Sequence, residues 1–358
     1  MVFPNTKQLK LQDALKQELQ SGNFQVGDRF YTEKEIMSKY RVSSVTVARA
    51  VGEMTRQGYF ERKRKLGTFV RGTRTIPGMS GEVMTCPLYI NQAGHEESAR
   101  HELSWFLVEE IRRGIINAYP GMVKILPMDE ILDAAQRDPN LLTILFPQRI
   151  EFFAEKYRSR CPGNTVEILL PPNFGPQVNC VRPDYMMGVF DAVSHLIHLG
   201  HRRIAYIGNA KSLYRYAAYR IALETHRQEM FPELVIRDDQ AVTYEDGALL
   251  IDRLFQLPEK QRPTAVFCVN DRIAIGAMEA LRNRGLVVPE DISVIGFDDI
   301  EESASAPVPL STVKVPYYEI GRAAVAVLME KIKTGQDVLP RTLPAVYLMR
   351  KSVGPVKK

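Results

Sequence analysis

Hydrophobic residues recur at helical spacing near the start of this chain. Leu11, Leu15 and Leu19 stand four residues apart, so they share one face of a predicted helix. We expect this helix to end near Gly22, because glycine commonly follows the last turn of a helix.

Two further helices are predicted from capping signals. Thr32 and Glu35 have the spacing of a capping box, and the helix that they open should end near Tyr40. Ser43 or Ser44 can cap the next helix, whose buried stripe would be formed by Val47, Val51 and Met54. Only about three residues separate these two helices, which is the geometry of a helix-turn-helix.

A β-hairpin is predicted directly after the third helix. Its strands are Tyr59–Arg62 and Thr68–Arg71, and its turn lies near Gly67. A cationic run, Arg62–Lys65, leads into this turn. Residues 1–74 therefore read as a winged helix-turn-helix, an α+β domain.

Charge is distributed unevenly along the chain. Residues 1–74 hold 15 Lys and Arg against 7 Asp and Glu, a net charge of +8, whereas the whole chain carries +5. A cationic run by itself favours a merely solvated basic surface. Its position at a hairpin tip beside a helix-turn-helix pattern instead favours binding of double-stranded DNA.

Residues 75–82 are predicted to form a flexible linker. The segment Arg71–Glu82 contains three glycines and one proline and has no hydrophobic periodicity. A separate domain, residues 83–358, would follow it.

Short apolar runs alternate with helical segments over residues 83–358. The candidate strands are Leu88–Ile90, Val123–Leu126, Leu142–Phe146, Val166–Leu170, Ile204–Ile207, Ala265–Val269 and Ser293–Phe297. Helices between them include Trp105–Ala118, Tyr185–Leu199, Tyr216–His226 and Asp271–Arg284. This alternation predicts an α/β body with parallel sheets, which bind ligands at the carboxyl ends of their strands. About 280 residues favour two lobes with a cleft between them.

Composition argues against a secreted or membrane protein. The four cysteines (Cys86, Cys161, Cys180 and Cys268) lie far apart, which favours reduced thiols in a cytoplasm. The N-terminus lacks the apolar run of a signal peptide, and no stretch of about 18 apolar residues suggests a membrane helix. We therefore expect a soluble cytoplasmic protein with no membrane partner.

Patterns that could indicate an enzyme or a metal site are weak. His195, His198 and His201 are spaced three apart, but Gly200 should end their helix before His201. The carboxylates between Asp298 and Glu302 could imitate a glycosidase pair, yet no positioned partner accompanies them. No phosphate-binding glycine motif is present. We expect no metal, no cofactor and no enzymatic activity.

The N-terminal domain resembles the winged helix of the GntR family over residues 7–71. The matching positions are Gly22, Gly27, Thr32, Glu33, Glu35, Ile36, Val42, Ser43, Thr46, Val47, Gly58 and Gly67–Val70. The resemblance implies DNA contacts from Lys34, Ser43, Ser44, Val45, Thr46 and the wing around Gly67, to which the charge pattern adds Lys63, Arg64 and Lys65.

This domain departs from the GntR pattern at three positions. The family usually has Arg where this chain has Ser44 and Ala48, and Gly where it has Lys65. The segment Val42–Arg49 is also similar to the recognition helix of LacI-type repressors, which implies a DNA contact from Arg49. The target sequence should therefore differ from a typical GntR operator.

The body resembles the effector domain of LacI/GalR repressors, which is periplasmic-binding-protein-like. Its motifs span about residues 181–333, whereas residues 83–180 match poorly. They include Asp184-x-x-x-Gly188, His195–Ala205, Arg262–Asp271, Ile273–Ala277, Val288–Asp299, Pro309–Val313 and Glu319–Arg322. A GntR-type head on a LacI-type body is similar to the architecture of arabinose-responsive repressors.

The resemblance implies an effector site at Arg215, Asn270 and Asp298. These side chains suit a polyol, because arginine donates, aspartate accepts and asparagine does both. A cap of a helix or turn is the alternative role for Asp298 and Asp299. Trp105 could stack on a sugar ring or lie in the core.

The sequence thus predicts a homodimeric, ligand-responsive transcription regulator, a repressor of a carbohydrate-use operon. A small-molecule effector, a sugar, would close the lobes and respace the two DNA-binding heads. The alternative is an intracellular sugar-binding protein or sugar-acting enzyme with a basic anchoring head.

Overall fold

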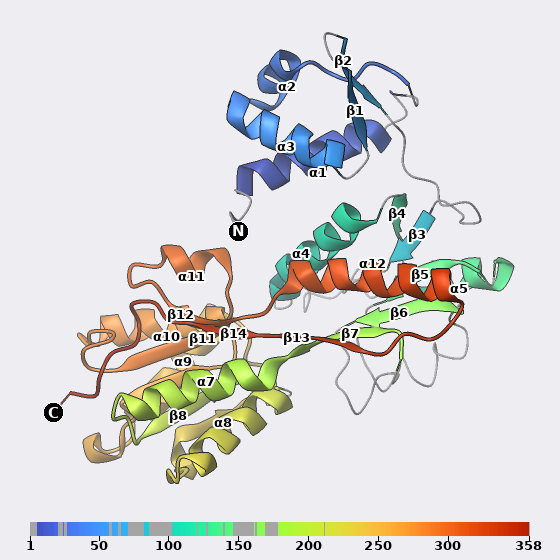
Figure 1. Ribbon diagram of the computed structural model, residues 1–358. Helices are drawn as coiled ribbons and strands as arrows, with labels where there is room; N and C mark the ends of the chain where they lie inside the picture. Colours follow the sequence, from blue (N-terminus) through green and yellow to red (C-terminus); the bar gives the residue numbers. More distant parts are fainter. Residues whose placement is uncertain are drawn as a thin grey trace.

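The computed structural model (Figure 1) consists of a small head and a body of two α/β lobes. It describes residues 6–20, 24, 27–56, 59–63, 66–70, 82–85, 102–119, 121–126, 128–138, 140–145, 161, 163–168, 178–210 and 212–357. The head and the body have separate hydrophobic cores.

The head is a winged helix-turn-helix, as the hydrophobic pattern predicted. Its helices are α1 (Thr6–Gln20), α2 (Glu33–Tyr40) and α3 (Ser44–Arg56), and its wing pairs β1 (Phe60–Lys63) with β2 (Gly67–Val70) in antiparallel register. The predicted stripes meet in one core, which contains Leu11, Leu15, Ile36, Val47, Val51 and Met54. The end of α1 that was predicted near Gly22 falls outside the described residues.

Local capping interactions determine where both helices of the helix-turn-helix begin. The Thr32 hydroxyl accepts from the Glu35 backbone N–H at 3.3 Å, and the Glu35 carboxylate accepts from the Thr32 N–H at 2.6 Å, so the predicted capping box forms. Ser43 caps α3, since its hydroxyl accepts from the Thr46 N–H at 3.3 Å. Between the helices, Arg41 takes a left-handed conformation (φ 52°), which makes the turn tight.

The first lobe is built on a six-stranded sheet in the order β13-β7-β6-β5-β3-β4, and all its pairs are parallel. Its strands are β3 (Glu82–Thr85), β4 (Met122–Ile125), β5 (Leu142–Leu145), β6 (Asn164–Ile168), β7 (Cys180–Asp184) and β13 (Arg341–Pro344). Its helices are α4 (Glu102–Ala118), α5 (Met128–Arg137) and α12 (Tyr317–Thr334). Figure 1 shows α4 and α12 together on the side of this sheet that faces the head.

The second lobe has a six-stranded sheet in the order β14-β12-β11-β10-β8-β9, in which only β14 is antiparallel. Its strands are β8 (Ile204–Gly208), β9 (Val235–Arg237), β10 (Ala265–Cys268), β11 (Ser293–Asp298), β12 (Ser311–Lys314) and β14 (Val346–Leu348). Its helices are α7 (Tyr185–His198), α8 (Leu213–Thr225), α9 (Tyr244–Phe255), α10 (Asp271–Asn283) and the short α11 (Glu301–Ser305).

Within the described residues, the chain passes between the lobes three times. The crossings run from β7 to α7, from β12 to α12 and from β13 to β14. Gly188 packs against two of them, because a Cβ there would lie 2.6 Å from Val313 and 2.9 Å from the Ala345 carbonyl oxygen. The lobes are therefore joined by three short segments beside the carboxyl ends of the strands.

The predicted strands of the body agree with the structure to within a few residues, apart from the first. Strand β3 begins at Glu82, the last residue of the predicted linker, whereas the candidate strand Leu88–Ile90 lies outside the described residues. Strands β7, β9, β12, β13 and β14 were not predicted. They have only three to five residues, and β7 and β13 contain proline, so their hydrophobic pattern is weak.

Candidate DNA-binding and effector sites

The N-terminal half of α3 presents one face to solvent. Val47 and Ala50 are buried beneath it, while Val45 is 57% exposed and Ser44 and Arg49 are also exposed. This arrangement leaves the side chains of the predicted recognition helix available to a duplex.

The wing extends this surface. The exposed ammonium of Lys63 lies 5.0 Å from the centroid of the Phe69 ring, and Arg62 forms an ion pair with Glu33 of α2 at 3.0 Å. Gly67 opens β2 at a φ of 115°, a conformation that favours glycine. Arg64 and Lys65 lie outside the described residues.

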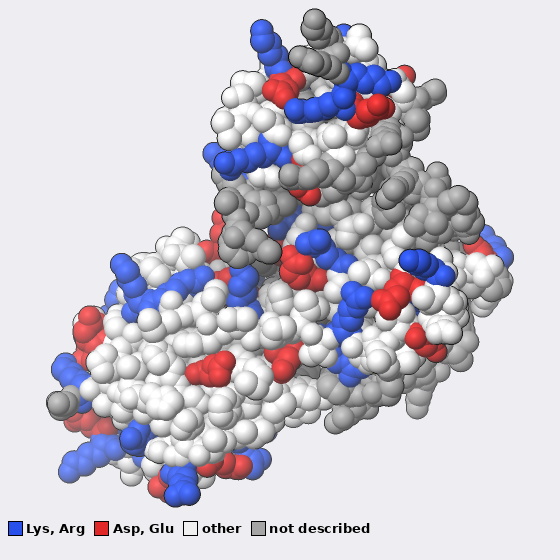
Figure 2. All heavy atoms as spheres, viewed as in Figure 1, with Lys and Arg blue, Asp and Glu red and all other residues white. Residues whose placement is uncertain are grey.

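Cationic side chains gather on the outer part of the head (Figure 2). Lys34 in α2, Arg49 in α3 and Lys63 in the wing are all exposed, and acidic residues lie between the cationic ones. Three separate elements thus contribute charges that can approach a phosphate backbone.

The candidate effector residues meet at the carboxyl edge of the second lobe's sheet. Asp298 ends β11, Asn270 follows β10, and Arg215 lies in α8 after β8. Strands β8, β10 and β11 are adjacent and parallel, so the segments that follow them converge at one edge.

Arg215 and Asp298 form the centre of this group. An Nη atom of Arg215 lies 3.8 Å from Oδ1 of Asp298, and the other donates to the Val269 carbonyl oxygen at 2.5 Å. The guanidinium also lies 3.8 Å from the centroid of the Phe297 ring and 5.6 Å from that of Tyr185. The arginine is therefore held in place by an ion pair, a carbonyl group and two aromatic rings.

Asp298 is a buried carboxylate in an uncommon backbone conformation. Its side chain is 3% exposed and its φ is 108°, and Asp299 follows at a φ of 60°. The Tyr317 hydroxyl donates to Oδ1 of Asp298 at 2.8 Å. Burial raises the pKa of Asp298, an effect that Arg215 and Tyr317 oppose. Backbone strain at such a position is typical of a functional site.

Asp299 has a different role from its neighbour. Its carboxylate forms ion pairs with Arg350 at 2.5 Å and with Lys314 at 3.3 Å. Neither aspartate caps α11, whose N-cap is Ile300. Neither aspartate therefore has the helix-capping role that the sequence offered as an alternative.

Asn270, in contrast, caps a helix. Its Oδ1 accepts from the Ile273 N–H at 2.8 Å, and its Nδ2 donates to the Val242 carbonyl oxygen at 3.3 Å. The residue is 6% exposed and begins α10. Sequence analysis gave Asn270 only a ligand-binding role, and the structure adds this stabilising one.

Asp271 is a buried acid that sequence analysis did not single out as a site residue. Its carboxylate accepts from the Ile300 N–H at 2.9 Å and from the hydroxyls of Ser303 and Thr312, each at 2.6 Å. Burial raises its pKa to about 7. Asp271 thus ties α10 to α11 and β12. The only sequence signal for it was its position next to Asn270 in the family motif.

The remaining candidates are located as follows. Position 105 lies in the first turn of α4, and the side chain of Trp105 lies outside the described residues. The ring nitrogens of His201 lie 2.9 Å from the Thr264 hydroxyl and 2.9 Å from the Gly354 carbonyl oxygen, and His195 contacts the Tyr347 hydroxyl at 3.1 Å. Across the described part of the chain, no group of three His, Cys, Asp or Glu residues could hold a metal ion.

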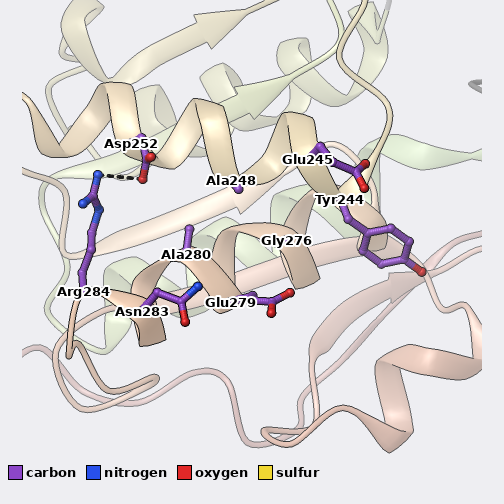
Figure 3. Close-up of a pocket in the computed structure, with 9 residues that line it drawn as sticks. All are labelled: Tyr244, Glu245, Ala248, Asp252, Gly276, Glu279, Ala280, Asn283 and Arg284. Carbon is purple, nitrogen blue, oxygen red and sulfur yellow. Dashed lines mark ion pairs between the residues drawn. The ribbon is translucent and has the colours of Figure 1, made fainter.

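A separate hollow of about 390 Å³ lies between α9 and α10 (Figure 3). Its lining includes Tyr244 near one end, and Arg284 and Asp252 form an ion pair of 2.7 Å at the other. Neither Arg215 nor Asp298 lines it. We do not assign the effector to this hollow, because the charged and aromatic groups described above lie elsewhere.

Comparison with known proteins supports both domains. The family of bacterial regulatory proteins, gntR, matches residues 7–70, and the periplasmic binding protein-like domain matches residues 193–353. The arabinose metabolism transcriptional repressor of Geobacillus stearothermophilus is 27% identical over 351 residues, which cover 91% of each chain.

Solved structures agree with these matches. A regulatory protein of the LacI family from Chloroflexus aggregans superposes with a TM-score of 0.63 at 27% identity, over 77% of this chain and 99% of that one. The lac repressor dimer bound to operator and an anti-inducer shares the fold, with a TM-score of 0.61 at 23% identity, over 76% of this chain and 93% of that one.

The fold and the two sites define a class, that of DNA-binding transcription regulators with a ligand-binding body. Within this class, the chain joins a GntR-type helix-turn-helix to a LacI-type periplasmic-binding-protein-like domain. In the part of the chain that the structure describes, no helix is both long and apolar enough to cross a membrane.

Proposed function

We propose that this protein is a cytoplasmic, homodimeric repressor of a carbohydrate-use operon, whose affinity for DNA depends on a sugar bound beside Asp298. The observation that carries the proposal is the buried Arg215–Asp298 pair, which lies at the carboxyl edge of the sheet against the Phe297 ring. The arabinose repressor that matches over 91% of both chains supports the same function.

The chemistry of this group suits a polyol. Asp298 can accept hydrogen bonds from sugar hydroxyls, Arg215 can donate to ring or hydroxyl oxygens, and aromatic rings favour contact with C–H faces. The Nδ2 group of Asn270 carries a second N–H besides the one that it donates to Val242. Trp105 remains a candidate for stacking on the sugar ring.

On the DNA side, the first turns of α3 would enter the major groove. Ser43, Ser44, Val45 and Thr46 lie at its N-terminal end, where recognition helices meet base edges. Arg49 would read a base, whereas Lys34 and the wing residues Lys63, Arg64, Lys65 and Gly67 would contact phosphates.

An enzyme with a basic anchoring head receives less support. Asp299 is engaged by Arg350 and Lys314, so it is not available as the acid or base partner of Asp298. Related proteins that match over most of the chain are transcriptional repressors.

The proposal can be tested with the full-length chain. Its operator is first selected from a pool of random duplex DNA, and sugars are screened by thermal shift, since a ligand that binds the folded state raises the melting temperature. Fluorescence anisotropy then measures operator affinity with and without each sugar that raises the melting temperature.

We expect one sugar both to stabilise the protein and to change operator affinity by about 5- to 150-fold, the usual range of allosteric coupling. A chain that binds no duplex better than random sequence would refute the regulator. A sugar that binds but is chemically converted would favour the enzyme.

A further inference from the structure

Two tyrosine hydroxyls lie at the ends of helices α4 and α12, one beside Asp298 and one in the head. Tyr317, in the first turn of α12, donates its hydroxyl to Asp298 at 2.8 Å. Tyr59, in the head, donates its hydroxyl to the carbonyl oxygen of Tyr119 at 3.3 Å. Tyr119 directly follows α4, so each bond lies at an end of the α4 or α12 helix.

Helices α4 and α12 are in backbone contact where these ends meet. A Cβ on Gly114 would lie 2.1 Å from the Tyr318 carbonyl oxygen, and a Cβ on Gly321 would lie 2.1 Å from that of Ile111. These contacts place the last turns of α4 against the first turns of α12. Such close packing leaves little room for one helix to move without the other.

Side chains strengthen the same contact. The ring of Tyr318 lies 5.2 Å from the guanidinium of Arg113 in α4. Tyr318 adjoins Tyr317 in sequence, and Arg113 adjoins Gly114, where the two backbones meet. The path from Asp298 to the carbonyl group that Tyr59 contacts therefore runs through the first turn of α12 and the last turns of α4.

At the head, Tyr59 joins the two elements that we expect to touch DNA. Its backbone N–H donates to the Met54 carbonyl oxygen in α3 at 3.0 Å, and the next residue, Phe60, begins the wing strand β1. Burial raises the pKa of Tyr59 to about 12, so its hydroxyl stays protonated and able to donate at neutral pH.

We propose that the first turn of α12 and the last turn of α4 relay occupancy of the Asp298 site to the head, with Tyr317 and Tyr59 as positioning residues at its two ends. A ligand hydroxyl that donates to Asp298 shares the carboxylate with Tyr317 and so weakens the bond from the tyrosine. A movement of the first turn of α12 would shift α4. It would also move the Tyr119 carbonyl group to which Tyr59 donates. This inference rests on the proposed function for its biological meaning.

The first experiment needs no ligand and no DNA. Hydrogen exchange of residues 54–63 is compared between the full-length wild type and Tyr317→Phe, which removes one hydroxyl in the body. We expect exchange in this segment of the head to change by several-fold. Tyr347→Phe is the matched control, because it removes another hydroxyl of the body, the one 3.1 Å from His195.

The relay is refuted if Tyr317→Phe leaves exchange at residues 54–63 unchanged, or if Tyr347→Phe changes it equally. Tyr59→Phe covers the case in which the Tyr317 variant fails to fold. It removes the contact from the head, and we expect faster exchange at residues 54–63, with the melting temperature of the body unchanged. Unchanged exchange in this variant also refutes the relay.

The second experiment uses the operator and sugar identified by the screens above. We expect Tyr59→Phe to bind the sugar as the wild type does. The ratio between its operator affinities with and without the sugar should fall to within about twofold of unity. A wild-type ratio in this variant refutes the relay. If no sugar changes the operator affinity of the wild type, the proposed sugar response is refuted instead. The hydrogen-exchange experiment then still tests the relay.

Discussion

The guanidinium of Arg215 lies 3.8 Å from the carboxylate of Asp298, and both side chains are largely withdrawn from solvent. A buried ion pair stabilises a fold only when further hydrogen bonds compensate for the lost hydration. Here the Val269 carbonyl oxygen accepts a hydrogen bond from Arg215, and the Tyr317 hydroxyl donates one to Asp298. The carboxylate retains acceptor capacity, which a ligand hydroxyl can use.

Asp298→Asn should give a folded protein that binds its operator but no longer responds to its sugar. The change keeps the shape of the side chain, yet it replaces one acceptor oxygen with a donor amide. Losing a charged hydrogen bond costs about 1.5–3 kcal/mol, so sugar affinity should fall by about 10- to 150-fold. Calorimetric titration of the sugar checks this. Asp291→Asn is the control, because Asp291 lies before the amino end of β11 and Asp298 at its carboxyl end. It should leave sugar affinity unchanged. Unchanged affinity in Asp298→Asn would make that residue purely structural.

Asn270 can be divided into its two roles by two substitutions. Asn270→Ala removes the helix cap and should lower the free energy of unfolding by about 0.5–2 kcal/mol, as well as weakening sugar binding. Asn270→Ser keeps a capping oxygen but removes the amide, so stability should recover while sugar binding stays weak. Thermal denaturation and sugar titration measure the two effects. Sugar binding that recovers fully in Asn270→Ser would limit the residue to capping.

Arg49 and Lys63 should differ in how they affect DNA binding. Arg49→Ala should lower operator affinity by about 1–3 kcal/mol and random-sequence affinity much less, because a bidentate base contact is specific. Lys63→Ala should weaken both similarly and reduce the salt dependence of binding. Titrations of operator and random duplexes at two salt concentrations distinguish these outcomes. Equal losses on both duplexes for Arg49→Ala would make it a phosphate contact.

Asp271 should make stability depend on pH. Its pKa rises from an ordinary 3.8 to about 7 on folding, so the native state holds a proton that the unfolded state releases between these values. Stability should therefore fall as pH rises from about 4 to about 7, by at most about 1.4 kcal/mol per pH unit. Burial lowers the pKa of His195 and His201, which acts in the opposite direction. The comparison is thus between wild type and Asp271→Asn, whose melting temperatures should converge as pH rises. Parallel curves would contradict the raised pKa.

The backbone contact between α4 and α12 predicts a strong effect of a single methyl group. Gly114→Ala would place a Cβ 2.1 Å from the Tyr318 carbonyl oxygen, so the helices must separate, at a cost of about 1–3 kcal/mol or more. Gly52→Ala in α3 is the matched control, because no atom lies within 4 Å of its added Cβ. That change should instead stabilise the head by about 0.5–1 kcal/mol. Denaturation of both variants measures the contrast, and equal stabilities would contradict the contact.

Local chemistry allowed much of the head to be predicted. The Thr32–Glu35 capping box and the stripe of Val47, Val51 and Met54 depend on residues three or four positions apart, so the sequence by itself sets where α2 and α3 begin and which faces they bury. The alternation of apolar runs and helices likewise determined the α/β class of the body.

The candidate effector residues differ in how far the sequence places them. Asp298 and Asn270 follow strands that are hydrophobic enough to recognise, so their common edge could be inferred. Arg215 was named only from the resemblance to LacI/GalR repressors, because it is held by Phe297, Val269 and Asp298, which lie more than fifty positions further along the chain.

Only the tertiary structure decided how these parts connect. Strands β13 and β14 have only four and three residues and gain their partners from distant segments, so no local pattern indicates the third crossing between the lobes. Other features also depend on residues far apart in sequence. They are the burial of Asp271, the hydrogen bond from Tyr317 to Asp298 and the hydrogen bond from Tyr59 to Tyr119. Periodicity reports which face of an element is apolar, whereas packing in three dimensions decides what that face meets.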